Sequence, residues 1–286
     1  MISVSDIRSR DIRFHYDLIT AFYRLLWGQH IHHGLWEPEH GVVTDESPRA
    51  AQIHLINQVA VKASIGPGQR VLDVGCGMGG SSIHLARERH CDVTGITLSP
   101  VQKAWATTSA ALSGVRRRTR FRRADAERIE FPAGEFDVVW SVECTEHLFD
   151  KPAFFRKAAT WLKPGGRMAI CAWLAGEKSD TPDGLQQVRL VCENFLCPSL
   201  GSEADYVEWM TAAGLEMVEV SDWTDQVLAT WEICERRVRR TGMRLLAKLV
   251  DRQTRNFLDH FETILNAYRS RAMGYGCFVA RKPIAD

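Results

Sequence analysis

A strand-like apolar run that leads directly into a cluster of glycines is the feature that most constrains this fold. The run Val71–Val74 is apolar except for Asp73, and a helical period begins at Ile83. Between them lie Gly75, Gly77 and Gly80. Glycine lets the backbone adopt positive φ and approach a ligand closely, and the following helix presents unpaired N–H groups at its start. The segment predicts a strand, turn and helix that hold a small, elongated cofactor.

The glycine spacing fits either a dinucleotide or an adenosyl cofactor. A dinucleotide site requires an acid about 20 residues further on, at the end of the second strand, to bind the ribose. The predicted second strand ends in Thr97 instead, and the acid of this region, Asp73, lies inside the first strand. From there it can orient the loop and receive an ammonium group. These residues resemble motif I of the class I S-adenosylmethionine (SAM) methyltransferases.

Composition narrows the class of protein. The 286 residues carry 36 Lys and Arg against 35 Asp and Glu, a net charge of +1, so no strong field attracts nucleic acid. The eight cysteines form no C-x-x-C pair, and Cys76 lies in the predicted cofactor turn, which favours reduced thiols and a cytoplasmic setting. No apolar run is long enough for a membrane span. The length fits one α/β domain with additions.

Short apolar runs alternate with helical stretches between residues 70 and 173, as in a parallel sheet covered on both faces. The predicted strands are Arg70–Val74, Asp92–Ile96, Arg120–Arg123, Phe136–Ser141, Arg167–Trp173, Gly214–Val220 and Tyr275–Ala280. The run Lys163–Gly166 predicts a sharp turn before the fifth of them. We expect the last strand to be antiparallel and at or near an edge of the sheet.

The resemblance implies a Rossmann-like class I methyltransferase fold. This is an α/β architecture, with a seven-stranded, mostly parallel sheet, helices on both faces and a helical N-terminal cap. We divide the chain into a helical cap without strands (1–64), a SAM-binding core (65–174), a substrate-pocket insertion (175–213), and the C-terminal helices and closing strands of the core (214–286).

In an open α/β sheet the ligand lies at the carboxyl ends of the strands. Ser99, followed by Pro100, is a suitable N-cap after the second strand. The run Gly-Ile-Thr-Leu-Ser-Pro-x-Gln, which ends at Gln102, resembles the γ-tocopherol, sterol and related small-molecule methyltransferases. Asp125, after the third strand, resembles the acid that reads the adenine amino group in such enzymes. The resemblance implies that the cofactor is bound by Asp73, Gly75, Gly77, Thr97, Leu98, Gln102, Asp125, Ala126, Tyr16 and Tyr23.

Two acids and a histidine follow the fourth strand, namely Glu143, Glu146 and His147. Such groups can orient a nucleophile or remove a proton, and histidine has the pKa suited to a base near neutrality. The segment resembles the Glu-x-x-Glu-His-Met stretch of tocopherol methyltransferase-like proteins, with Leu148 in place of methionine. We predict that the three side chains face the acceptor as catalytic residues. The alternative for His147 is a structural histidine bonded to backbone.

The N-terminal part carries a second signature, in which Tyr16-Asp17 is followed by a Trp-Gly-x-His-x-His-His-Gly run at Trp27–Gly34. It resembles the cap that the same subgroup folds over SAM. The rings of Tyr16 and Tyr23 can attract a sulfonium through cation–π interactions, or they can simply build the core between cap and sheet. No acid or cysteine lies at a familiar ligand spacing from the three histidines, so we predict no metal.

These expectations describe an enzyme that transfers a methyl group from SAM, with S-adenosylhomocysteine as product, to a small, apolar acceptor. The acceptor is a prenylated phenol or quinol, a terpenoid or sterol carbon, or an amine nitrogen. Two alternatives stay open: a SAM-binding protein without methyl transfer, such as a pericyclic-type catalyst or a binding module, and an NAD(P)-dependent oxidoreductase. The run Arg236–Arg240 is typical of a solvated helix face. The sequence leaves open whether the protein is a monomer or a homodimer.

Overall fold

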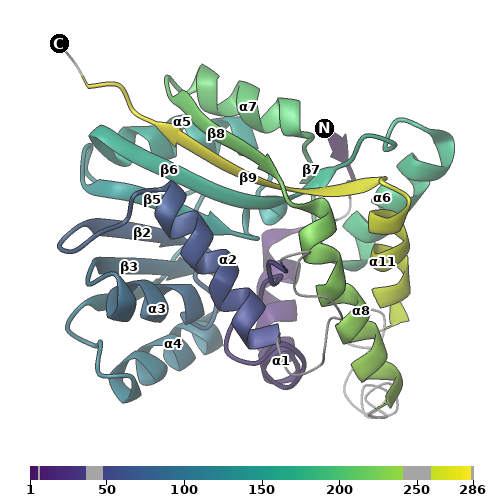
Figure 1. Ribbon diagram of the computed structural model, residues 1–286, viewed down its shortest axis with the longest axis horizontal. Helices are drawn as coiled ribbons and strands as arrows, with labels where there is room; N and C mark the ends of the chain where they lie inside the picture. The colour runs from purple at the N-terminus through teal and green to yellow at the C-terminus, as the bar shows by residue number, and fades with distance from the viewer. Residues whose placement is uncertain (6, 37–47, 241–258, 285–286) are drawn as a thin grey trace.

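The computed structural model describes residues 1–5, 7–36, 48–240 and 259–284. Its centre is a seven-stranded sheet in the order β4-β3-β2-β5-β6-β9-β8, flanked by helices on both faces (Figure 1). The strands are β2 (Arg70–Val74), β3 (Asp92–Thr97), β4 (Thr119–Arg123), β5 (Phe136–Val142), β6 (Leu162–Ala175), β8 (Glu216–Asp222) and β9 (Met273–Arg281). The strands from β4 to β6 are parallel, and β9 pairs antiparallel with β6 and with β8. The predicted seven-stranded, mostly parallel sheet is confirmed.

Helices cover the sheet and extend past the carboxyl ends of its parallel strands. They are α1 (Ser9–Trp27), α2 (Pro48–Lys62), α3 (Gly80–Glu88), α4 (Pro100–Leu112), α5 (Lys151–Trp161), α6 (Pro182–Asn194), α7 (Glu203–Ala212), α8 (Thr224–Arg240) and α11 (Phe261–Arg269), with a short 3₁₀ turn, η2, at Thr145–His147. One buried apolar cluster joins α2, α3 and α4 to the sheet and continues into α6, α8 and α11. A second cluster packs α5 and α7 on the opposite face. Because both faces are covered, the central strands read as continuous apolar runs.

Two features of the fold differ from the expectation. Residues Ile2–Ser3 form a strand, β1, that pairs antiparallel with β7 (Ser199–Leu200), so the prediction of an N-terminal part without strands is wrong. A two-residue strand is too short to leave a hydrophobic pattern. The turn predicted at Lys163–Gly166 lies inside β6 as a bulge, because Phe136 pairs with Leu162 while Val138 pairs with Arg167.

Helix α4 begins where the sequence predicts, and its first turn anchors α1. Ser99 Oγ accepts a hydrogen bond from the Gln102 N–H at 3.0 Å, and Pro100 occupies the first turn. The same hydroxyl donates to Asp17 Oδ1 of α1 at 2.5 Å. One side chain therefore caps α4 and fixes α1 over the carboxyl end of β3.

The loop between β2 and α3 needs glycine for both its conformation and its closeness to Cys144, which follows β5. Gly75 and Gly77 have φ values of 75° and 52°. The N–H groups of Gly75 and Cys76 both donate to the Ile96 carbonyl, at 3.0 and 2.9 Å. A Cβ on Gly75 would lie 2.3 Å from the Cβ and Sγ of Cys144, whereas a Cβ on Gly77 would have no neighbour within 4 Å.

We expect Gly75→Ala to lower the free energy of unfolding by about 2–5 kcal/mol, because the new Cβ adds a clash to the left-handed backbone. Gly77→Ala is the matched control, since it carries only the conformational cost of about 1–2 kcal/mol. Urea unfolding of both variants measures the difference. Equal losses would show that Cys144 yields to the added methyl group.

Candidate active site

Two cavities adjoin at the carboxyl ends of the parallel strands, and His147 lines both. The first, of about 400 Å³, lies against the glycine loop. Of the residues predicted to bind the cofactor, it is lined by Gly75, Thr97, Leu98, Asp125 and Ala126. These residues lie at or just after the carboxyl ends of three different strands, as the ligand rule for open α/β sheets requires. The cavity also has contributions from Ser9 and Ile12 at the start of α1.

Asp73 lies beneath the glycine loop and does not line this cavity. Its side chain is buried, and Oδ2 accepts a hydrogen bond from Ser82 Oγ at 2.5 Å. Burial raises the pKa of Asp73 to about 6, although the bonds from Ser82 oppose the shift. Asp73 thus ties the end of β2 to the first turn of α3, which fixes the loop between them.

Thr97 and Gln102 are bonded to each other. Thr97 Oγ1 donates to Gln102 Oε1 at 2.8 Å, and both side chains are buried. The Ser99 N–H in turn donates to Thr97 Oγ1 at 3.3 Å. The residue at the end of β3, where an acid would bind a ribose in a dinucleotide site, is therefore the neutral Thr97, bonded to the neutral Gln102.

Asp125 keeps part of its carboxylate accessible at the cavity. Oδ1 accepts a hydrogen bond from the Glu127 N–H at 3.0 Å, and the Asp125 carbonyl accepts from the N–H groups of Arg128 and Ile129. The carboxylate side chain is 25% exposed. Asp125 starts a turn and remains able to accept a further hydrogen bond from a ligand.

The N-terminal segment covers the glycine loop from the other side. A Cβ on Gly80 would lie 2.7 Å from the Gln29 carbonyl oxygen and from His30 Nδ1. The side chain of Tyr23 lies outside the described part of the structure. Tyr16 lines the second cavity and not the first.

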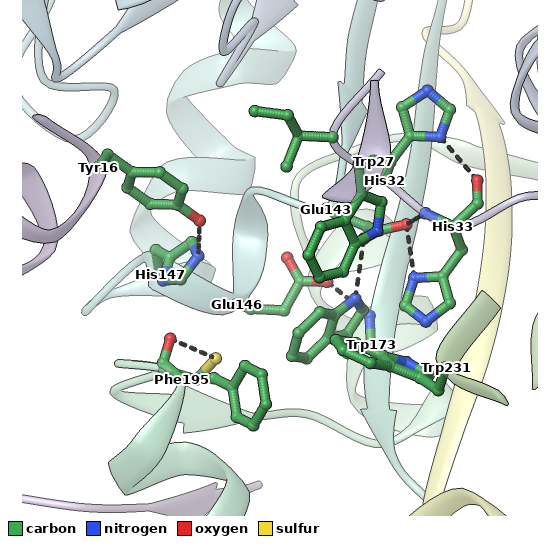
Figure 2. Close-up of a pocket in the computed structure, with 12 residues that line it drawn as sticks. Tyr16, Trp27, His32, His33, Glu143, Glu146, His147, Trp173, Phe195 and Trp231 are labelled. Carbon is green, nitrogen blue, oxygen red and sulfur yellow. Dashed lines mark hydrogen bonds and ion pairs between the residues drawn. The ribbon is translucent and has the colours of Figure 1, made fainter. Parts of the chain in front are cut away.

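The second cavity, of about 510 Å³, is an aromatic chamber with a few buried polar groups (Figure 2). Its lining residues are Tyr16, Trp27, Ile31, His32, His33, Glu143, Glu146, His147, Trp173, Phe195, Cys197 and Trp231. Trp173, Phe195 and Trp231 pack edge to face, with ring centroids 5.7–5.8 Å apart. All three predicted catalytic residues, Glu143, Glu146 and His147, lie in this cavity.

His147 is held between backbone and tyrosine. Its Nδ1 lies 2.9 Å from the Leu196 carbonyl oxygen and its Nε2 lies 2.8 Å from the Tyr16 hydroxyl. Because a carbonyl only accepts, Nδ1 carries the proton and Nε2 accepts from Tyr16. Burial lowers the pKa of His147 to about 4, so the ring is neutral at neutral pH. The bond to backbone that we considered as a structural alternative is present, and it leaves Nε2 as the acceptor that faces Tyr16.

Glu143 is not free to act as a base. Its Oε1 accepts hydrogen bonds from the His33 N–H (2.7 Å), His33 Nδ1 (2.9 Å) and the Tyr275 hydroxyl (2.9 Å), and Oε2 accepts from Trp173 Nε1 (3.1 Å). Burial alone would raise the pKa of Glu143, but the adjacent His33 outweighs it and holds the pKa at about 2. Glu143 is a buried anion with four donors, and its φ of 54° places it in the left-handed region.

Glu146 is a neutral acid in the same chamber. Its Oε1 accepts a hydrogen bond from the Trp173 N–H at 2.5 Å, while Oε2 is buried without a partner among the described residues. Burial raises the pKa of Glu146 to about 8. A protonated carboxyl group at this position can donate a hydrogen bond to a ligand oxygen.

The three N-terminal histidines, His30, His32 and His33, make different contacts. Among the described residues, no group of three or more His, Cys, Asp or Glu side chains is arranged to hold a metal ion. Burial lowers the pKa of His30 to about 2 and lowers that of His32 as well. His32 Nδ1 donates to the His33 carbonyl at 2.7 Å. His33 Nδ1 donates a hydrogen bond to Glu143 Oε1 at 2.9 Å.

Sequence reasoning missed most of the chamber wall. Trp173 ends a predicted strand and points to the site, a position that the ligand rule for parallel sheets could have singled out. Phe195 and Trp231 come from α6 and α8 regions with no motif.

None of the described helices is long and apolar enough to cross a membrane.

The sheet order and the two cavities at its switch point define a class I methyltransferase fold. The chain belongs to the mycolic acid cyclopropane synthetase family, whose model matches residues 4–274. The methyltransferase resemblance of the sequence is thereby confirmed, and the oxidoreductase alternative is not supported.

Curated relatives of this chain are small-molecule methyltransferases. The chloroplastic tocopherol O-methyltransferase of Arabidopsis thaliana is 34% identical over 76% of this chain, and the alignment spans 66% of the plant protein, just under two thirds. The 27-O-demethylrifamycin SV methyltransferase of Amycolatopsis mediterranei is 30% identical over 94% of this chain and 95% of its own.

Solved structures share the whole architecture. The [4+2]-cyclase SpnF aligns with a TM-score of 0.83 at 25% identity, over 99% of both chains. Geranyl diphosphate C-methyltransferase of Streptomyces coelicolor, solved with Mg²⁺, geranyl diphosphate and S-adenosylhomocysteine, aligns with a TM-score of 0.72 at 21% identity, over 96% of this chain and 97% of that one. The fold therefore hosts both methyl transfer and ring closure.

Because the pKa of Glu146 is raised from 4.5 to about 8, the folded state keeps a proton that the unfolded state loses. Its contribution to stability is full below pH 4.5 and is lost as pH rises through about 8. We expect Glu146→Gln to remove this loss. Between mildly acidic and alkaline pH, the free energy of unfolding of the variant should rise relative to that of the wild type by about 4 kcal/mol. Urea unfolding at several pH values measures the gain. The matched control is Glu193→Gln on the exposed side of α6, and a pH-independent difference for Glu146→Gln would contradict the assignment.

Proposed function

We propose that this protein is a SAM-dependent methyltransferase that acts on a small, uncharged, largely apolar acceptor. The observation that carries the proposal is the meeting of two cavities at one histidine, His147. One cavity lies against a glycine loop of the kind that binds nucleoside-type ligands, and the other has an aromatic wall. When bound, SAM supplies a methyl group made electrophilic by its sulfonium sulfur.

The residues at the first cavity fit an adenosyl cofactor. Gly75 brings its backbone to the wall of this cavity, and the partly exposed Asp125 carboxylate can accept from an adenine amino group. Thr97, bonded to Gln102, offers a neutral partner for ribose hydroxyls. We propose that Leu98 and Ala126 complete this wall, and that Asp73 acts through the loop that it fixes. Gly77 gives that loop its left-handed turn.

The second cavity favours an acceptor without formal charge. No lysine or arginine is among its described lining residues, so nothing there neutralises a phosphate. Glu143 is already paired with His33, and Glu146 is protonated at neutral pH, so neither offers a free anion to an ammonium ion. Trp27, Phe195 and the other rings suit a phenol, an alkene or a neutral amine.

We propose that His147 and Tyr16 handle the proton of the acceptor. The Leu196 carbonyl fixes the Nδ1 proton of His147, which leaves Nε2 as the basic position toward Tyr16 and the cavity. A hydroxyl or amine acceptor can pass its proton to this pair as its oxygen or nitrogen forms the new bond to the methyl carbon. Glu146 can hold the acceptor oxygen by donating a hydrogen bond. The aromatic wall excludes water from the reacting atoms.

Calorimetric titration with SAM, S-adenosylhomocysteine and NADH tests the cofactor class. We expect binding of the two adenosyl ligands and none of NADH, and a weaker affinity for both adenosyl ligands in Asp125→Ala. Binding of NADH alone would reject the proposal. Unchanged adenosyl affinity in Asp125→Ala would reject the adenine contact without affecting the rest.

His147→Asn should lower kcat by about 10²–10⁴-fold, because the amide can still donate to Leu196 but no basic nitrogen remains. We expect Tyr16→Phe to lower kcat by about 10-fold or more through loss of the same proton path. The readout is transfer of labelled methyl from SAM to phenols, prenylquinols, terpenoids and amines. The matched control is His90→Asn, an exposed histidine with a left-handed backbone that Asn tolerates. Full activity of His147→Asn would leave His147 a purely structural role.

The likeness to SpnF favours one second candidate, a SAM-binding catalyst of ring closure without methyl transfer. Such a protein would keep the cofactor cavity and the aromatic chamber. It would bind S-adenosylhomocysteine but methylate none of the acceptors. The paired Tyr16 and His147 favour methyl transfer, because a pericyclic step moves no proton.

Three further expectations belong to the same proposal. All eight cysteines are free thiols, which supports a reducing, cytoplasmic location, although the plant tocopherol relatives are named as chloroplastic. The near-neutral net charge supports the absence of a nucleic-acid partner. We propose residues 1–64 as the cap, 65–174 as the SAM-binding core, 175–213 as the pocket insertion and 214–286 as the closing part, in a monomer or homodimer.

A further inference from the structure

His33 sits on a segment whose backbone is fixed at several points. Gln52 Nε2 of α2 lies 2.7 Å from the His30 carbonyl oxygen and 3.1 Å from that of His32. The Gly34 N–H donates to Thr230 Oγ1 of α8 at 3.0 Å. The His33 N–H itself donates to Glu143. The position of the His33 ring is therefore set before any ligand binds.

Glu143 also sets the orientation of that ring. Its Oε1 accepts from His33 Nδ1 at 2.9 Å, and the carboxylate is held in turn by Tyr275 and Trp173. A carboxylate oxygen only accepts, so Nδ1 carries a proton. The remaining ring nitrogen, Nε2, is the position at which His33 can bind something else.

Nε2 of His33 has no hydrogen-bond partner among the described residues, and the side chain is only 1% exposed. The ring lines the chamber, where it packs edge-on against Trp231 and Trp173 at centroid distances of 5.3 and 5.8 Å. A buried polar atom without a partner is costly. A ligand group that meets Nε2 would remove that cost, which makes this wall of the chamber a binding position.

We propose that His33 Nε2, oriented by Glu143, binds a second hydroxyl group of the acceptor, distinct from the atom that is methylated beside His147. A hydroxyl group both donates and accepts, so it pairs with Nε2 in either protonation state of the ring. Figure 2 shows the Tyr16–His147 pair and the His33–Glu143 pair on different sides of the chamber, with Glu146 between them. The chamber thus selects uncharged ring compounds with polar groups at two positions. This inference rests on the proposed acceptor cavity.

The test compares two probes that differ in one hydroxyl group, 2-naphthol and naphthalene-2,6-diol, by calorimetric titration of the full chain. We expect the wild type to bind the diol about 5-fold more tightly, the value of one hydrogen bond. His33→Asn keeps an amide N–H for Glu143 but removes Nε2, so the preference should fall to about 1-fold while 2-naphthol affinity stays within about 2-fold. His33→Gln, which returns a polar atom near Nε2, should restore part of the preference.

His90→Asn is again the matched control and should keep the wild-type preference. A diol preference that survives in His33→Asn would overturn the inference, as would equal or undetectable binding of the two probes to the wild type. A structural role of His33 alone would weaken both probes alike, and this too would overturn it. Titration with S-adenosylhomocysteine reports on the proposed function separately, because loss of that binding does not depend on the ratio between the probes.

Discussion

The site depends on one buried carboxylate. Glu143 follows β5, yet its four hydrogen-bond donors come from the N-terminal segment, from β6 and from β9. It accepts a positive φ of 54° to reach them. A buried anion is stable only when donors surround it, so removing any one of these segments would leave the carboxylate with fewer hydrogen bonds. The carboxylate thereby joins the cap to the sheet and gives the aromatic chamber its shape.

The sequence was sufficient to predict the sheet and the class of cofactor. The apolar run before Gly75 predicts β2 because a central parallel strand is buried on both faces. Ser99 and Pro100 predict the start of α4 because capping is a local interaction. Thr97, in place of the acid that a dinucleotide site requires, argues against a dinucleotide, and Asp73 inside the first strand favours an adenosyl site. The named family confirms the fold and the cofactor class, whereas the role of each site residue remains a prediction.

The acceptor side could not be predicted in the same way. His33 and Glu143 are 110 positions apart, and Tyr275 is 132 positions from Glu143. A sequence motif spans only neighbouring residues, so it cannot predict these contacts. Sequence reasoning placed Glu143 correctly at the chamber but as a free catalytic group, since it could not count the donors around the carboxylate. The strand β1 was missed because two residues are too few to show an alternating hydrophobic pattern. The aromatic wall of Trp231 and Phe195 arises from helices that only the tertiary structure brings together.

One helix takes part in both cavities. The start of α1 contributes Ser9 and Ile12 to the cofactor cavity, while Tyr16 and Trp27, further along it, line the acceptor chamber. A rigid-body shift of α1 along its axis would therefore change both cavities together. The shapes of the two cavities are therefore coupled through one helix, and the bond between Ser99 and Asp17 that anchors α1 holds both of them.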